Sequence, residues 1–184
     1  MKIIIVGCGR VGAQTAAELD KRGEHVTVVD VDQRAFQRLP AKFGGVTVRG
    51  SGTDEDILHD AGAEMSDLFM ALTEGDNRNA LAAQLAKHVF GIPRVLAKVN
   101  DPVRADAYRS LGLEIICRTV ILSDALVVAA TQGAEATGGA VLPATAEPLR
   151  GAPAPGTRAD MEVRAALAAE DAGDRSESSD AAGS

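Results

Sequence analysis

The feature that most constrains the fold is a set of three glycines near the start of the chain, Gly7, Gly9 and Gly12. They follow an apolar stretch at 3–6 and precede a segment of helical periodicity, and Asp30 closes the next apolar stretch. Gly-x-Gly-x-x-Gly alone is weak evidence, but the order strand, glycine turn, helix, strand and acid is typical of a dinucleotide-binding unit. The chain therefore predicts a nucleotide site at its first turn.

Each of the three positions in such a turn requires glycine for a different physical reason. The first allows the tight turn out of the strand, the second lets the backbone approach a pyrophosphate, and the third lets the helix pack closely on the sheet. A helix beginning near Arg10 would point its unpaired N–H groups and positive dipole end at the phosphates. Asp30 can accept hydrogen bonds from both ribose hydroxyls and disfavours a 2′-phosphate. NAD, ADP or ATP therefore fits better than NADP.

Segments with strand and helix patterns alternate six times along the chain, which favours a parallel sheet covered on both faces. The expected fold class is α/β, a Rossmann-like doubly wound parallel six-stranded sheet. Asp32 is expected to cap a helix, and Thr53 with Asp56 resembles a capping box. We expect strands near 2–6, 25–29, 46–49, 67–72, 94–99 and 113–117, and helices near 10–22, 32–41, 54–61, 76–89, 101–111 and 119–131.

The composition changes sharply after about residue 133. Glycine, alanine, proline, serine and acidic residues dominate from there on, and few large apolar side chains remain. Such a composition cannot bury enough apolar surface to offset the entropy of ordering the chain. We therefore expect a nucleotide-binding domain at 1–133 and a low-complexity, disordered C-terminal tail at 134–184.

Several classes of function are disfavoured by composition. A net charge of −7, with one tyrosine, four phenylalanines and no tryptophan, argues against a nucleic-acid partner. No run of apolar residues is long enough to span a membrane or to form a signal peptide. The two cysteines, Cys8 and Cys117, make no disulfide framework, and the three histidines lack the spacing of metal ligands. A cytosolic protein without a metal site is expected.

Five sequence blocks fall at the ends of successive expected strands, where the ligand of an open α/β sheet lies. They are Gly7 to Gly12, Val29 to Asp32, Gly50 to Asp54, Thr73 to Asn79 and Ala97 to Pro102. Together they resemble the nucleotide-binding N-terminal domain of the TrkA family, also called the KTN or RCK domain. Members of this family are cytosolic regulators of bacterial potassium uptake. The resemblance covers about residues 1–135 of this chain.

The resemblance implies a role for each block. The first glycine turn would wrap the diphosphate, Asp30 would hold the adenosine ribose, and the third block would line the adenine side. Thr73 and Glu74 would meet the distal ribose or the terminal phosphate, Lys98 would add positive charge, and Arg10 would reach the outer phosphate. The cofactor-binding residues expected are Gly7, Cys8, Gly9, Arg10, Val11, Gly12, Asp30, Asp32, Ser51, Gly52, Thr53, Thr73, Glu74 and Lys98.

The sequence departs from the family pattern in two places. The turn on the adenine side usually reads Gly-Asp, but here Ser51 follows Gly50, so a carboxylate contact is lost. Many relatives continue into a C-terminal ligand-binding domain, whereas this chain continues into the tail.

The segment 119–131 is apolar around nearly its whole circumference, although a helix on a sheet needs only one apolar face. In the family, the helix at this point crosses to a partner subunit. We therefore expect a homodimer or a higher ring formed through this helix. The alternative is a core helix that lies under the tail.

Two functions share this nucleotide cradle. The resemblance implies a cytosolic regulatory subunit of a potassium uptake system that binds NAD(H) or ATP/ADP and gates a membrane potassium transporter. It would lie at the inner face of the plasma membrane through that transporter, without inserting into the membrane. The alternative is an NAD-dependent oxidoreductase, which needs a substrate lobe and a proton-transfer group. No such lobe is evident, and Tyr108 lies on an expected helix away from the strand ends, so a regulator without catalytic residues is expected.

Overall fold

The computed structural model describes residues 1–132, so the tail expected at 134–184 lies outside the described residues. One six-stranded sheet in the order β3-β2-β1-β4-β5-β6 organises this region, and every neighbouring pair of strands is parallel. The strands are β1 (Lys2–Val6), β2 (His25–Asp30), β3 (Val46–Arg49), β4 (Leu68–Ala71), β5 (Arg94–Val99) and β6 (Glu114–Cys117). This confirms the doubly wound fold. The order reverses between β1 and β4, which is where such sheets bind ligands.

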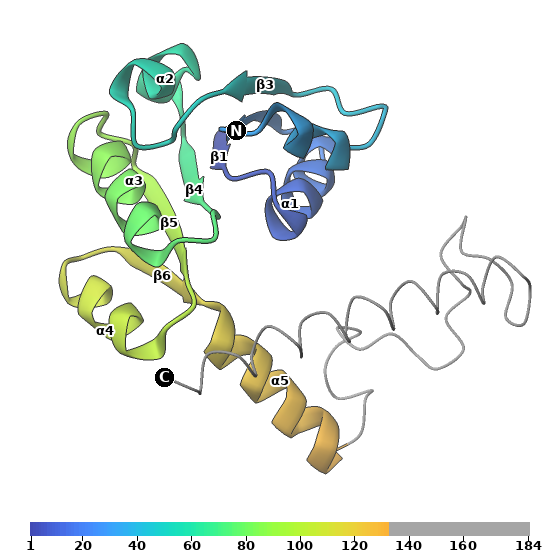
Figure 1. Cartoon of the computed structure of the whole chain (residues 1–184), viewed down its shortest axis with the longest axis vertical. Helices are drawn as coiled ribbons and strands as arrows, with labels where there is room; N and C mark the ends of the chain where they lie inside the picture. The colour runs from blue at the N-terminus through green and yellow to red at the C-terminus, as the bar shows by residue number, and fades with distance from the viewer. Residues whose placement is uncertain (133–184) are drawn as a thin grey trace, which may run out of the picture. The chain divides into compact units, whose positions relative to one another are not determined.

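Helical segments cover both faces of the sheet. They are α1 (Arg10–Lys21), η1 (Gln33–Arg38), α2 (Glu55–Asp60), η2 (Ala63–Met65), α3 (Asp76–His88), α4 (Pro102–Ser110) and α5 (Arg118–Gln132). Figure 1 shows α1 on one side of the sheet and α3 and α4 on the other. Residues 1–128 form one unit by their internal contacts. None of the helices within residues 1–132 is long and apolar enough to cross a membrane.

The core explains why β1 occupies the centre of the sheet. Its residues Ile3 and Ile5 pack in one apolar cluster with Ala13 and Ala16 of α1. The alternate residues, Ile4 and Val6, belong to a second cluster with the alanines of α3 and with Leu58 of α2. A strand with apolar residues on both faces must be covered on both, because each buried side chain of this size contributes about 1.5–3 kcal/mol.

Two local expectations were wrong. Instead of a helix at 32–41 there is the 3-10 helix η1, which ends early because Leu39 precedes Pro40 and adopts an extended conformation with ψ of 145°. The capping box is also absent. Asp54 is the N-cap of α2 and accepts hydrogen bonds from the amides of Asp56 and Ile57, so the acid next to Thr53 does the capping.

None of the residues of α5, the last helix within residues 1–132, is buried. Ile121, Leu122 and Leu126 are each more than half exposed. The apolar circumference expected from the sequence is therefore uncovered in the structure of this single chain, as far as the described residues extend.

Candidate functional site

A pocket of about 530 Å³ opens at the carboxyl ends of β1, β2 and β4. Its position matches the point where the strand order reverses, as the sequence predicts for a nucleotide site. The lining combines backbone of the glycine turn with acids and arginines. The lining residues are Val6, Gly7, Cys8, Gly9, Val29, Asp30, Val31, Asp32, Ala35, Arg38, Gly50, Ser51, Gly52, Leu72, Thr73, Glu74 and Arg78.

The glycine turn shows three different reasons for glycine. Gly7 has φ of 102°, and a Cβ there would lie 2.9 Å from the backbone of Leu72 and Thr73. A Cβ on Gly12 would lie 1.9 Å from the carbonyl oxygen of Gly7, so α1 starts directly against the turn. A Cβ on Gly9 would meet no heavy atom of the described residues within 4 Å. Gly9 therefore borders open pocket space, as close approach of a phosphate would require.

Asp30, the last residue of β2, is bound to the backbone on both of its oxygens. Oδ2 accepts a hydrogen bond from the amide of Cys8 over 2.6 Å, and Oδ1 accepts one from the amide of Asp32 over 2.9 Å. An ionised carboxylate has about four acceptor positions, so it can still accept bonds from ribose hydroxyls. The geometry is compatible with the role predicted for Asp30.

Two groups of the pocket lining close to Asp30 have shifted pKa values, the thiol of Cys8 and the carboxyl of Asp32. Burial, together with the charge of Asp30, raises the pKa of the Cys8 thiol above its usual 9.0, although Arg38 partly opposes this. The pKa of Asp32 is lowered, mainly because its carboxylate accepts a hydrogen bond from the backbone amide of Arg34 over 2.9 Å. Asp32 thus caps η1, as expected, and lines the pocket as well.

The loop after β3 forms one wall of the pocket, which includes Ser51 and Gly52. A Cβ on Gly52 would lie 2.2 Å from Cγ1 of Val6, so only glycine allows this close packing. Ser51 and Thr53 share a hydrogen bond of 2.8 Å between their hydroxyls. Thr53 braces Ser51 in this way and does not itself line the pocket.

The opposite wall is formed by Thr73 and Glu74, which follow β4, and is held by a fully buried Asn79. Oδ1 of Asn79 accepts hydrogen bonds from the amide and the hydroxyl of Thr73, over 2.9 Å and 2.6 Å. Its Nδ2 donates to the carbonyl oxygens of Thr73 and Lys98, over 2.9 Å and 2.8 Å. All four polar positions of this amide are therefore used to fix the wall to β5.

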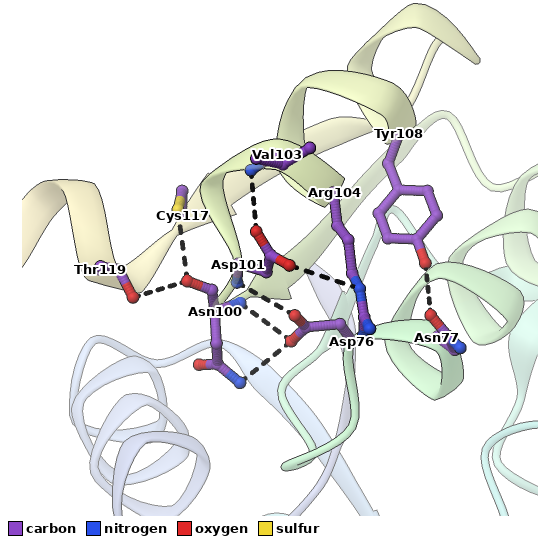
Figure 2. A network of polar contacts seen from close by, with 9 residues as sticks. All are labelled: Asp76, Asn77, Asn100, Asp101, Val103, Arg104, Tyr108, Cys117 and Thr119. Atoms are coloured by element: carbon purple, nitrogen blue, oxygen red, sulfur yellow. Dashed lines mark hydrogen bonds and ion pairs between the residues drawn. The ribbon is translucent and has the colours of Figure 1, made fainter.

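A polar network continues from this wall toward α5 (Figure 2). Asp76, the first residue of α3, accepts hydrogen bonds from the amides of Asn100 and Asp101, over 2.9 Å and 3.1 Å. The side-chain amide of Asn100 also donates to Asp76 and to the carbonyl oxygen of Glu74. In turn, the carbonyl oxygen of Asn100 accepts a hydrogen bond of 2.6 Å from the hydroxyl of Thr119 in α5. Hydrogen bonds thus connect the pocket rim to the start of α5.

The structure brings most of the predicted site residues together. Those that line the pocket are Gly7, Cys8, Gly9, Asp30, Asp32, Ser51, Gly52, Thr73 and Glu74. Those outside its lining are Arg10, Val11, Gly12, Thr53 and Lys98. Lys98 is only 5% exposed and lies within β5, and Arg10 lies on the exposed surface of α1.

Two arginines of the lining, Arg38 and Arg78, were missed by the sequence reasoning. The place of Arg78 at the pocket could have been predicted from the sequence. It stands in the first turn of a helix that follows a strand-end motif, and such a turn points back at the ligand edge of the sheet. The sequence did not predict that Arg38 lines the pocket, because the position of its side chain depends on where the short helix η1 ends.

The family model and the curated relatives agree on one family. The family model described as the TrkA-N domain matches residues 3–119. The Trk system potassium uptake protein TrkA of Streptomyces coelicolor is 39% identical over 149 residues, which cover 81% of this chain and 62% of that protein. Among solved structures, the GsuK channel bound to NAD superposes with a TM-score of 0.62 at 22% identity, covering 75% of this chain and 24% of that one. GsuK bound to ADP gives a TM-score of 0.61, also at 22% identity, covering 71% and 34%. The two solved structures support the fold.

The chain spans only part of the curated relatives that it matches. The matched region is 62% of the Streptomyces coelicolor protein, 22% of the TrkA of Vibrio alginolyticus and 45% of the TrkA homolog of Pyrococcus abyssi.

Proposed function

The chain belongs to the TrkA-N domain family, and on that premise we propose that it is a cytosolic regulatory subunit of a potassium uptake system. In this proposal it binds NAD(H) or ATP/ADP in the pocket and gates a membrane potassium transporter. The observation that carries the proposal is the pocket itself, where the Asp30 carboxylate and the glycine turn meet at the switch point of the sheet. A relative 39% identical is described as a potassium uptake protein, which supports the proposed process.

The pocket has the parts that an adenine nucleotide needs. We assign the ribose of adenosine to Asp30, the diphosphate to the open backbone at Gly9, and the adenine side to the wall at Ser51 and Gly52. The distal part of the ligand then meets Thr73 and Glu74. GsuK, which has a similar fold, is described in complexes with NAD and with ADP, and both ligands fit this assignment. Arg10, Val11, Gly12, Thr53 and Lys98 would act from outside the pocket lining, by shaping the turn or by contributing charge.

The same chain is proposed to act without chemical turnover. A dehydrogenase needs a proton-transfer group beside the nicotinamide. The described residues place Tyr108 elsewhere, since its hydroxyl donates to Asn77 over 2.6 Å and the residue does not line the pocket. No observation on the described residues favours the alternative of an NAD-dependent oxidoreductase.

Regulation by a bound nucleotide needs a partner whose arrangement depends on occupancy. We propose a homodimer or higher ring formed through the 119–131 helix, whose apolar side chains Ile121, Leu122 and Leu126 are more than half exposed. Nucleotides would gate transport only if they bind two arrangements of such subunits with different affinities. This assembly would lie in the cytoplasm, held at the plasma membrane by the transporter.

Calorimetric titration of the purified chain with NAD, NADH, ADP and ATP tests the proposal, with Asp30→Ala beside it. Binding that Asp30→Ala abolishes supports the assignment, and potassium uptake by cells carrying Asp30→Ala should lose its nucleotide response. Asp106→Ala is the matched control, because Asp106 pairs with Arg109 on the surface of α4. Oxidation of NADH in the presence of a small substrate would instead make the chain an enzyme.

A further inference from the structure

Two arginines line the pocket, Arg38 from η1 and Arg78 from α3, and the contacts of their side chains differ. Near Asp30, Nη1 of Arg38 donates to the carbonyl oxygen of Ala35 over 3.4 Å. The side chain of Arg78, in the first turn of α3, makes no hydrogen bond or ion pair with any residue within 1–132. Its guanidinium carries five donors that remain open to a ligand.

Asp30 and Arg78 lie at or beyond the ends of two strands that are separated by one other strand in the sheet. Asp30 ends β2 and Arg78 follows β4, and β1 lies between these two strands in the sheet. Neighbouring strands are about 5 Å apart, so the ends of β2 and β4 are separated by roughly 10 Å. A nucleotide whose ribose lies at Asp30 places its phosphates over the turn that leaves β1. Its terminal group would extend toward the β4 side of the pocket, whose lining includes Arg78.

Glu74 also lines the pocket, and its carboxylate favours a different ligand group from the guanidinium of Arg78. Glu74 lines the pocket, is exposed, and forms no ion pair with the described residues. A carboxylate accepts hydrogen bonds from ribose hydroxyls and repels a phosphate, whereas a guanidinium binds a phosphate through two parallel hydrogen bonds. The two side chains therefore favour different terminal groups.

We propose that Arg78 and Glu74 decide which adenine nucleotide the pocket prefers. Arg78 selects the terminal phosphate of a nucleoside triphosphate, and Glu74 selects the second ribose of a dinucleotide. The inference rests on the proposed nucleotide site and adds its specificity. It also moves the phosphate-reading role from Arg10, which lies outside the pocket lining, to Arg78.

Calorimetry with AMP, ADP, ATP and NAD on Arg78→Gln and Glu74→Gln tests this division. Removing a charge-assisted hydrogen bond should raise the Kd for ATP about tenfold or more in Arg78→Gln, with changes below about threefold for ADP and NAD. Glu74→Gln should tighten ATP binding several-fold and weaken NAD binding. The matched control is Arg94→Gln, because Arg94 pairs with Glu114 at the opposite end of the sheet. It should leave all four affinities unchanged.

Some results would overturn the inference and leave the proposed function standing. Equal losses of ATP, ADP and NAD affinity in Arg78→Gln would show a general charge effect without selection. ATP preference that disappears in Arg10→Gln but survives in Arg78→Gln would return the role to Arg10. Absence of any nucleotide binding to the unmodified chain would instead refute the proposed function itself. Arg78→Lys, which keeps the charge but not the paired donors, should show an intermediate ATP affinity, and thermal melting checks that each variant folds.

Discussion

The carboxylate of Asp30 holds the backbone of Cys8, whose amide donates to Oδ2 over 2.6 Å. Its other oxygen accepts a hydrogen bond from the amide of Asp32. One side chain at the end of β2 therefore fixes the glycine turn after β1 and the start of the next loop. The residue expected to recognise the ribose also contributes to folding, so its substitution should affect stability as well as binding.

Asp30→Asn and Asp30→Ala should destabilise the chain to different degrees. The asparagine keeps one acceptor oxygen for the two amides, whereas alanine leaves both without a partner, at about 1–3 kcal/mol for each. The free energy of unfolding should fall in the order wild type, Asp30→Asn, Asp30→Ala, as urea titration can measure. Equal stability of all three would contradict the structural role of this carboxylate.

Gly12→Ala should lower the stability of the chain, whereas Gly9→Ala should lower its nucleotide affinity. Gly12→Ala forces a Cβ against the carbonyl oxygen of Gly7, so we expect a loss of about 3 kcal/mol in unfolding free energy. Gly9→Ala has room for its Cβ and an ordinary φ of −72°, so its melting temperature should stay near that of the wild type. It should nonetheless lose nucleotide affinity, because the methyl group occupies the space of the phosphate.

The two glycine variants are each other's control. Wild-type ATP affinity in a stable Gly9→Ala would place the phosphates elsewhere in the pocket. A Gly12→Ala chain that melts like the wild type would show that the turn can shift away from α1 at little cost.

Asn79→Ala should weaken the distal wall of the pocket. The substitution removes four hydrogen bonds from a fully buried site and leaves the polar groups of Thr73 without partners. We expect a loss of about 2–4 kcal/mol in the free energy of unfolding. Hydrogen exchange should show faster exchange of the Thr73 amide. Asn77→Ala, on the exposed side of the same helix turn, serves as the comparison and should cost less than about 1 kcal/mol.

The Cys8 thiol should make stability depend on pH in the alkaline range. Its pKa is raised in the folded chain, so folding favours the protonated thiol. The contribution is fully present below the usual pKa of 9.0 and is lost as the pH rises through the higher folded value. The wild type should therefore lose more stability than Cys8→Ala between neutral pH and the alkaline range, as urea titrations at several pH values can show. A parallel decline in the two proteins would argue against the raised pKa.

Much of the fold and one half of the site follow from short-range sequence patterns. The glycine spacing, the apolar strand before it and the acid after the next strand lie within one β-α-β unit, so their geometry is set locally. These local patterns are sufficient to predict that Asp30 and Gly7 lie at the site, and both line the pocket.

The other half depends on how separate elements meet. Lys98 was assigned to the site by family resemblance, but it precedes the final residue of β5 and lies within the strand, whereas Glu74 lies beyond the end of β4. Arg78 reaches the pocket only because α3 starts directly after that loop. The error at η1 is of another kind, since Pro40 ends the helix and the apolar pattern does not show it.

The pocket is assembled from two halves of the sheet, with the glycine turn and Asp30 on one side and Thr73, Glu74 and Arg78 on the other. Substitutions that are roughly 7–10 Å apart and share no partner have nearly additive effects. The half after β4 can therefore change while the half with the glycine turn and Asp30 stays the same. If the proposed assignment holds, one or two substitutions after β4 would change the terminal group that the pocket prefers and leave the contacts at Asp30 in place.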